Sequence, residues 1–282
     1  MTDPKKILRL NFPQWQGGNN PAYRIGAQVL RAIAPAPQGP EETIAVPPPA
    51  QAERPVEQGI LSRPALLEQV AAARAAIARH APEAIVTLGG DCHVNQRYGD
   101  DLAVIWIDAH PDIMGAAQIR AAHAHVLGML MGQGDADFTD TVPRKVAPGQ
   151  ILYVGLTETT PFETDFIAGR GIARLSPEDL GGSSERVLAW LRARGATKVA
   201  VHFDLDVLDP AFTDFLLFND PDLAPGAFEG VARGRMQFAE VAGILQAVAA
   251  ETDIVGLAIT EYLPWSAIRL AESLRRLPLL GD

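Results

Sequence analysis

Residues 102–112 read LAVIWIDAHPD, an apolar run that ends at Asp108 and is followed by His110 and Asp112. A continuous apolar run of this length is typical of a strand buried on both faces, as in a parallel sheet. Because side chains alternate along an extended chain, Asp108, His110 and Asp112 are expected on one side of it. The stretch therefore predicts a buried strand that delivers two carboxylates and an imidazole to one small volume.

Similar strand-like runs alternate with helical patterns along the whole chain. The runs are residues 7–12, 84–88, 102–107, 151–155, 199–203 and 254–259, with a short strand at 43–46 inside a proline-rich stretch. The helical patterns are residues 64–79, 124–131, 185–194, 238–250 and 267–274. This alternation predicts an α/β fold, a three-layer α/β/α sandwich with a mainly parallel sheet. Because no linker interrupts the middle of the chain, we expect a single domain, residues 1–282.

The composition and net charge indicate which kinds of partner the protein binds. The chain has 282 residues, a formal net charge of −10 and one cysteine, Cys92. Nucleic acids and anionic membranes attract basic surfaces, so this charge predicts a small-molecule substrate, with no nucleic acid and no membrane partner. No apolar stretch reaches the roughly 18–20 residues of a membrane span, and a lone thiol cannot form an internal disulfide, so we expect a cytoplasmic protein.

Four of the expected strands end in polar residues that carry chemistry. In an open parallel sheet, ligands bind beyond the carboxyl ends of the strands. The strand ends read Gly89-Gly90-Asp91-Cys92-His93, Asp108-Ala109-His110-Pro111-Asp112, Asp204-Leu205-Asp206-Val207-Leu208-Asp209-Pro210 and Glu261-Tyr262-Leu263-Pro264. These groups are therefore expected to converge at one edge of the sheet.

The carboxylates in these groups predict a metal site. Asp204 and Asp206 alternate as Asp108 and Asp112 do, and four like charges in one volume are disfavoured unless cations compensate them. Carboxylates with an imidazole suit Mn²⁺, and we expect two such ions. A metal pair lowers the pKa of bridging water and supplies hydroxide as a nucleophile, so the pattern predicts a hydrolase.

These motifs resemble those of the ureohydrolase superfamily of arginase, agmatinase and formiminoglutamase. The shared patterns are Asp-Ala-His-x-Asp at 108–112, Asp-x-Asp-x-x-Asp-Pro at 204–210 and Glu-x-x-Pro at 261–264, each after an expected strand. The Gly-Gly-Asp-Cys sequence at 89–92 is similar to a subgroup that resembles Nω-hydroxy-arginine hydrolase. The resemblance implies an arginase-like fold and a homo-oligomer.

The resemblance also implies a ligand set for the two metals. It gives Asp108 and Asp204 as bridging carboxylates, His110 and Asp206 as further ligands of one metal, and Asp112 and Cys92 as further ligands of the other. Most family members carry histidine at the Cys92 position, and a thiolate is a softer ligand, so other divalent metals are possible here. Consecutive residues at a strand end point in opposite directions, so only Cys92 or His93 is expected to face the metals, and we favour Cys92.

The resemblance implies two catalytic residues and one further substrate contact. His123 matches a substrate-site histidine that would move a proton to the leaving amine, with His125 as the alternative. Glu261 matches the carboxylate that accepts the planar guanidinium fork. Thr160 takes the place of an acidic residue that arginases use to bind their substrate.

The chain departs from the arginase pattern where the rest of arginine would bind. Met114 occupies the place of a substrate-binding asparagine, so plain L-arginine is not the expected substrate. Residues 215–235 replace a glycine-rich connection and are expected to shape the mouth of the pocket, with Arg233 or Arg235 as candidates for binding a substrate carboxylate. His202 is expected to pack away from the metal aspartates.

The sequence thus predicts an amidinohydrolase that acts on a guanidino or N-hydroxyguanidino compound through a metal-bridging hydroxide and releases urea or hydroxyurea. One rival is a formimino, amidine or amide hydrolase on the same metals, which would release formamide or ammonia instead. A second rival is a catalytically silent arginase-like paralogue, which Cys92 and the missing arginine contacts would favour. Product analysis and metal content separate the three hypotheses.

Overall fold

A computed structural model of the protein describes residues 2–49, 54–90 and 101–274. Its centre is an eight-stranded sheet in the order β2-β1-β5-β10-β9-β6-β7-β8. The strands are β1 (Ile7–Phe12), β2 (Glu41–Thr43), β5 (Ala84–Gly89), β6 (Leu102–Ile107), β7 (Ile151–Val154), β8 (Ala173–Leu175), β9 (Lys198–Asp204) and β10 (Asp253–Thr260). Neighbouring strands pair in parallel throughout this sheet, which confirms the predicted parallel architecture.

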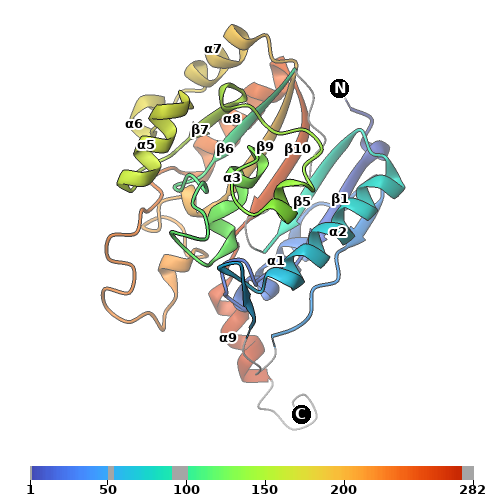
Figure 1. Ribbon diagram of the computed structural model, residues 1–282, viewed down its shortest axis with the longest axis vertical. Coiled ribbons are helices and arrows are strands. Elements are labelled where there is room, and N and C mark those ends of the chain that lie inside the picture. Colours follow the sequence, from blue (N-terminus) through green and yellow to red (C-terminus); the bar gives the residue numbers. More distant parts are fainter. Residues whose placement is uncertain (1, 50–53, 91–100, 275–282) are drawn as a thin grey trace.

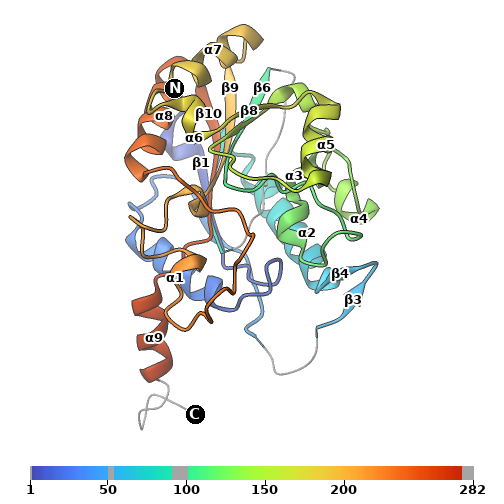
Figure 2. The ribbon, with the colours of Figure 1, turned by 90° about the vertical axis from the view of Figure 1, so that its left-hand side faces the viewer.

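Helices cover both faces of the sheet, as Figure 1 and Figure 2 show. They are α1 (Ala22–Ile33), α2 (Arg63–His80), α3 (Val126–Leu130), α4 (Ala136–Thr139), α5 (Pro161–Arg170), α6 (Pro177–Leu180), α7 (Glu185–Arg194), α8 (Phe238–Glu251) and α9 (Trp265–Leu274). A separate short hairpin joins β3 (Val56–Glu57) to β4 (Ile60–Leu61). Within the described residues, no helix is both long and apolar enough to cross a membrane.

Two hydrophobic cores show that the fold has three layers. Ile105 of β6 packs in one core with side chains of α7 and α8. Val104, the preceding residue, packs in the other core with side chains of α3 and α5. Because neighbouring side chains of a strand point to opposite faces, the two helix pairs lie on opposite sides of the sheet. Figure 2 shows the same separation, and the expected α/β/α sandwich is confirmed.

The order of the strands brings the polar strand ends together. β9 and β10 come last in the chain, yet they lie between β5 and β6 in the middle of the sheet. The register pairs Ile107 of β6 with Phe203 of β9, and Asp204 of β9 with Thr260 of β10. Asp108 and Glu261 directly follow Ile107 and Thr260, so the carboxyl ends of the central strands form one row with Asp204.

Two local expectations differ from the structure. The short strand expected at 43–46 lies earlier, at β2, because Arg9 of β1 pairs with Glu41 and Asn11 pairs with Thr43. The single helix expected at 124–131 is a 3-10 helix, η2 (Ala122–His125), followed by the short α3. The other 3-10 helices are η1 (Pro4–Lys6), η3 (Pro148–Gln150), η4 (Leu205–Val207) and η5 (Leu217–Asn219).

Candidate active site

Asp108 directly follows β6 and is held by two hydrogen bonds. Its Oδ1 accepts the backbone N–H of His110 at 2.7 Å, and its Oδ2 accepts the indole N–H of Trp106 at 3.1 Å. Trp106 precedes Asp108 by two positions and therefore shares its face of the sheet. Since Asp108 is only 1% exposed, its carboxylate is oriented by the core rather than by water.

Asp204 ends β9, and Asp206 lies in η4, the 3-10 turn that follows. Oδ1 of Asp204 accepts the N–H of Asp206 at 2.8 Å, and Oδ2 accepts the hydroxyl of Thr260 at 2.9 Å. Oδ2 of Asp206 lies 2.9 Å from Nδ1 of His110. The groups that follow β6 and β9 thus meet in one buried cluster.

Glu261 and Asp112 are held in the cluster by unusual backbone conformations. Glu261 has a φ of +65° and Asp112 a φ of +51°, in the left-handed region that residues other than glycine rarely adopt. The N–H of Glu261 donates to the carbonyl of Gly90 at 2.8 Å, and its Oε2 accepts the hydroxyl of Tyr23 at 2.8 Å. Such strain costs roughly 1–3 kcal/mol and persists only where the surrounding structure imposes it.

The clustered carboxylates perturb the pKa values of their neighbours. Oxygens of Asp204, Asp206 and Glu261 lie within 4.8 Å of one another. Burial, together with the charge of Asp108, raises the pKa of Asp112 well above its ordinary value. Burial alone would lower the pKa of His110, but the charges of Asp206 and Asp108 outweigh it and raise that pKa. The cluster therefore has an excess of negative charge that favours bound cations.

The donor atoms in this cluster fit divalent metal ions. Among the described residues, Oδ2 of Asp112, Oδ1 of Asp206 and both ring nitrogens of His202 are buried without a hydrogen-bond partner. Buried polar atoms without partners are costly, and metal coordination is one way to satisfy them. Oxygen donors with few nitrogen donors suit hard ions such as Mn²⁺ or Mg²⁺, with imidazole moving the preference towards Mn²⁺.

The expectation that His202 packs away from the aspartates is wrong. His202 precedes Asp204 by two positions in β9, so both side chains lie on the same face of the strand. Its ring stacks on Trp106 with 3.9 Å between ring centroids, and its Nε2 lies 3.6 Å from Oδ2 of Asp108. Since its side chain is 0% exposed, His202 is a buried imidazole directly beneath the carboxylate cluster.

His123, rather than His125, faces the space above the cluster. His123 is half-buried and lines the cavity described below, and its Nδ1 lies 3.2 Å from the carbonyl of Gly17. A carbonyl only accepts, so Nδ1 carries the hydrogen and donates to Gly17, and Nε2 is the acceptor nitrogen of the neutral ring. His125 is buried, and its Nε2 is held at 2.8 Å by the carbonyl of Ile119.

Thr160 lines the cavity, but its polar groups already serve a helix cap. Its N–H and its hydroxyl donate to Oε2 of Glu163 at 2.7 and 2.8 Å at the start of α5. Glu163 is 5% exposed and lines the same cavity. The buried acidic group on this side of the cavity is thus Glu163, three residues after the position that the sequence indicated. Cys92 and His93 lie outside the described residues.

A cavity of about 770 Å³ opens over the carboxylate cluster. Its floor contains the predicted metal-site residues of the strand ends. The described site residues that line it are Asp108, His110, Asp112, His123, Thr160, Asp204, Asp206 and Glu261. The structure therefore brings together the predicted metal-site and catalytic residues that it describes, together with Thr160.

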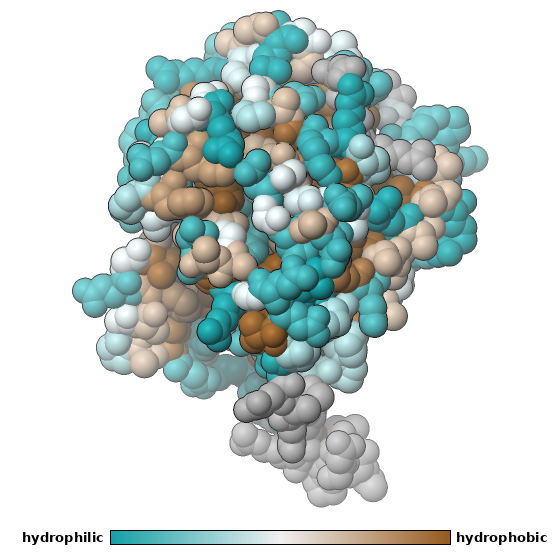
Figure 3. All heavy atoms as spheres, in the orientation of Figure 1, coloured by the Kyte–Doolittle hydropathy of each residue, from teal (hydrophilic) through white to brown (hydrophobic). Residues whose placement is uncertain are grey.

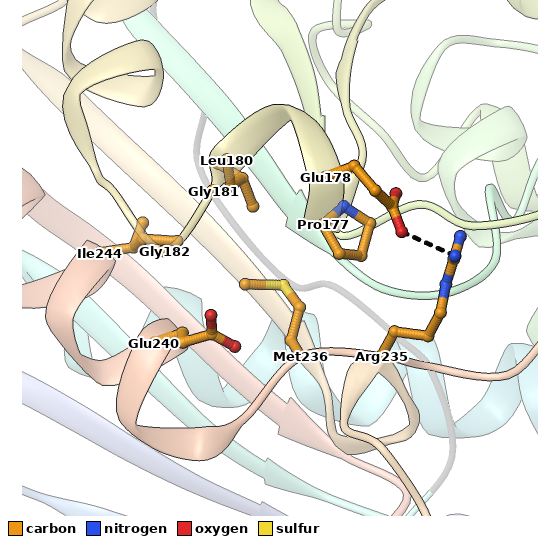
Figure 4. A pocket seen from close by; sticks show the side chains of 9 residues that line it. All are labelled: Pro177, Glu178, Leu180, Gly181, Gly182, Arg235, Met236, Glu240 and Ile244. Carbon is orange, nitrogen blue, oxygen red and sulfur yellow. Dashed lines mark hydrogen bonds and ion pairs between the residues drawn. The ribbon is translucent and has the colours of Figure 1, made fainter.

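The two arginines suggested for a substrate carboxylate do not line this cavity. Arg235 lines a separate cavity of about 270 Å³, where it donates to Oε1 of Glu178 at 2.7 Å (Figure 4). Arg233 is exposed, with its guanidinium carbon 5.1 Å from the ring centre of Phe218. Neither arginine is therefore placed to bind a ligand over the carboxylate cluster.

Sequence reasoning missed Tyr23 and misplaced His202. Tyr23 belongs to α1, and its contact with Glu261 joins residues 238 positions apart, so no local pattern could reveal it. The signal for His202 was present, because positions 202 and 204 are two residues apart in one strand and therefore share a face. Reading that spacing correctly would have placed the imidazole with the aspartates.

The parallel sheet, with helices on both faces and a buried carboxylate cluster at its carboxyl edge, is typical of an α/β protein with a metal-binding site. The family model described as "Arginase family" matches residues 44–273. The chain is 30% identical over 205 residues to the arginase of Eremothecium gossypii, which covers 66% of this chain and 48% of that relative. This protein belongs to the arginase family.

Solved structures agree with this assignment at the level of the fold. Arginase from Bacillus caldovelox has a TM-score of 0.74 at 18% identity and covers 99% of this chain and 100% of its own. Entamoeba histolytica arginase in complex with L-ornithine has a TM-score of 0.74 at 19% identity, covering 94% and 93%. The match to the Eremothecium arginase spans about half the length of that relative.

Proposed function

We propose that this protein is a metal-dependent amidinohydrolase that hydrolyses a guanidino or N-hydroxyguanidino compound and releases urea or hydroxyurea with an amine. The observation that carries the proposal is the position of the Glu261 carboxylate beside the aspartate cluster. Glu261 has an oxygen within 4.8 Å of oxygens of Asp204 and Asp206. A guanidinium held by Glu261 would thus have its reactive carbon next to the metal site.

The family membership and the clustering of the described carboxylates support a proposed ligand set. We propose that Asp108, His110, Asp112, Asp204 and Asp206, together with Cys92, would hold two Mn²⁺ ions. Bound divalent ions would lower the pKa of water and so supply hydroxide as the nucleophile for the guanidinium carbon. A cytoplasmic location, one domain and a homo-oligomeric state complete the proposal.

The chain's own residues would orient the substrate and move protons. Glu261 would accept hydrogen bonds from the guanidinium. The hydroxyl of Tyr23 donates to Oε2 of Glu261 and holds the carboxylate in place. His123 would give a proton to the leaving amine, since its imidazole lines the cavity above the cluster. Thr160 would contact the substrate at the cavity wall, where its hydroxyl donates to Glu163.

The test is product analysis with purified protein loaded with Mn²⁺. Urea and hydroxyurea are measured with arginine, Nω-hydroxy-arginine, agmatine and guanidinobutyrate, using the Asp204→Asn/Asp206→Asn double variant as the control. Urea or hydroxyurea released by the wild type alone supports the proposal. Release of formamide or ammonia from amidines or amides without either product would move the protein to the rival hydrolase class.

A further inference from the structure

The outer wall of the cavity is apolar. Its apolar side chains come mainly from the connection between β9 and α8, with two more from the connection that follows β6. These are Leu217, Phe218, Phe228, Val231 and Ala232, joined by Met114 and Ile119. Figure 3 shows hydrophobic side chains at the lower left of the molecule, where Figure 1 draws the β9–α8 connection. We refer to the five residues 217, 218, 228, 231 and 232 as the apolar wall.

Hydrogen bonds fix the residues just before the apolar wall relative to the segment of Glu261. The backbone N–H of Leu263 donates to the carbonyl of Phe215 at 2.9 Å, and the indole of Trp265 donates to the carbonyl of Leu216 at 2.7 Å. Both donors belong to the segment that begins with Glu261. The wall is thus fastened to the same segment as the carboxylate that would anchor the guanidinium.

The two aromatic rings of the wall support each other. Phe218 and Phe228 meet edge to face with 5.4 Å between their ring centres. Both are half-buried, whereas the carboxylates of the floor, such as Asp204 at 1%, are almost fully buried. This gradient in exposure places the rings nearer to the mouth of the cavity than the metal-site residues.

The charged side chains that line the cavity away from the floor are acidic. Glu158 and Glu163 lie on the side of α5, and Glu163 is 5% exposed. Among the residues that the structure describes, neither lysine nor arginine lines the cavity. A substrate carboxylate would meet the negative charges of Glu163, which is buried, and Glu158, which is exposed, and this repulsion disfavours its binding.

We infer that the apolar wall binds an apolar substituent, so that the preferred substrates are guanidino compounds on an alkyl or arylalkyl chain without a carboxylate. The inference rests on the proposed function, because it uses Glu261 as the anchor of the guanidinium. Burial of each further methylene group on the wall should then lower KM about fourfold until the wall is covered.

The experiment compares substrates that differ only in the tail. Urea release by the Mn²⁺-loaded protein is measured with methyl-, butyl- and hexylguanidine and with phenethylguanidine. Pentylguanidine and 4-guanidinobutyrate form a matched pair, because their tails are similar in length and differ in the terminal carboxylate. We expect kcat/KM to rise along the alkyl series and to be at least tenfold higher for pentylguanidine than for 4-guanidinobutyrate.

Variants of the apolar wall test whether the substrate tail binds there. Phe228→Ala should raise KM for hexylguanidine about tenfold and reduce the ratio of kcat/KM between hexyl- and methylguanidine. Phe212→Ala is the matched control, since Phe212 is on the same connection, is 76% exposed and does not line the cavity. An equal loss for both substrates in Phe228→Ala would contradict the wall as a binding surface for the tail.

Binding measurements keep this inference separate from the proposed function. Dissociation constants of the alkylguanidines are measured by calorimetry on the Mn²⁺-loaded protein. Affinity that rises with chain length without release of urea would overturn the proposed function and leave the apolar subsite standing. Urea release that favours 4-guanidinobutyrate or arginine over pentylguanidine would keep the proposed function and overturn the inference.

Discussion

The floor and the mouth of the cavity are built in opposite ways. On the floor, strand ends hold buried carboxylates, and neighbours such as Trp106 and Thr260 donate hydrogen bonds to them. At the mouth, residues 211–235 form a connection whose one regular element is the 3-10 helix η5. Strand ends place donor atoms accurately, whereas a connection only needs to pack and keep its backbone hydrogen bonded. We therefore expect the floor to determine the reaction and the mouth to determine which substrate is used.

The largest expected effect is on the floor. The double variant Asp204→Asn/Asp206→Asn removes two carboxylate charges from the cluster and should lower metal binding below detection. Activity on the best substrate should fall by more than about a thousandfold, because metal activation of water supplies several kcal/mol. Metal content by elemental analysis and urea release are measured on the same samples. Full activity in this variant would contradict the assignment of the floor.

His202 provides a smaller test beneath the floor. His202→Ser removes the imidazole that lies 3.6 Å from Asp108 and should weaken metal affinity roughly 10- to 100-fold, as expected for groups that orient metal ligands. Calorimetric titration with Mn²⁺ measures the change. His80→Ser, which alters a histidine at the end of α2, is the control. Equal affinity in His202→Ser and wild type would show that His202 only packs against Trp106.

Tyr23 tests the link between α1 and the floor. Tyr23→Phe removes the hydroxyl that donates to Glu261 and should reduce kcat/KM about tenfold, since a hydrogen bond to a charged group is worth roughly 1.5–3 kcal/mol. Metal content should remain unchanged, because Tyr23 acts on Glu261. Tyr262→Phe is the matched control in the adjacent segment. A loss of metal in Tyr23→Phe would show that the tyrosine supports the metal site itself.

The smallest expected effect is at the mouth. Arg233→Ala removes the guanidinium that lies over Phe218 and should raise KM for hexylguanidine about two- to fivefold, because an exposed cation–π contact is worth roughly 0.5–1 kcal/mol. Metal content should not change. An effect larger than that of Tyr23→Phe would reverse the order of floor and mouth and contradict the division between them.

The fold and much of the floor could be predicted because both depend on local patterns. The apolar run at 102–107 coincides with β6, and the residues that follow it lie where ligands of a parallel sheet are expected. The spacing of Asp204 and Asp206 placed them together correctly, but through the 3-10 turn η4 after β9, in which Oδ1 of Asp204 accepts the N–H of Asp206, rather than through strand alternation.

The rest depends on contacts between distant parts of the chain. Local patterns do not reveal which strands lie next to each other in the sheet. The observed strand order brings Trp106 of β6 beside His202 of β9. The sequence indicated that Thr160 replaces an acidic residue of arginases, and it did not reveal that Glu163, which forms the helix cap of α5 with Thr160, lines the cavity. The mouth has little periodic pattern, so its aromatic contacts were not predictable from spacing.

The most direct test of the account is the number of metal ions that the folded protein binds. Purified protein is stripped with a chelator, reloaded with Mn²⁺ and analysed for metal content, with the Asp204→Asn/Asp206→Asn variant treated in parallel. We expect two ions per chain for the wild type and a clear loss in the variant. A folded wild type that binds no more metal than the variant would contradict the metal centre and favour a silent arginase-like paralogue.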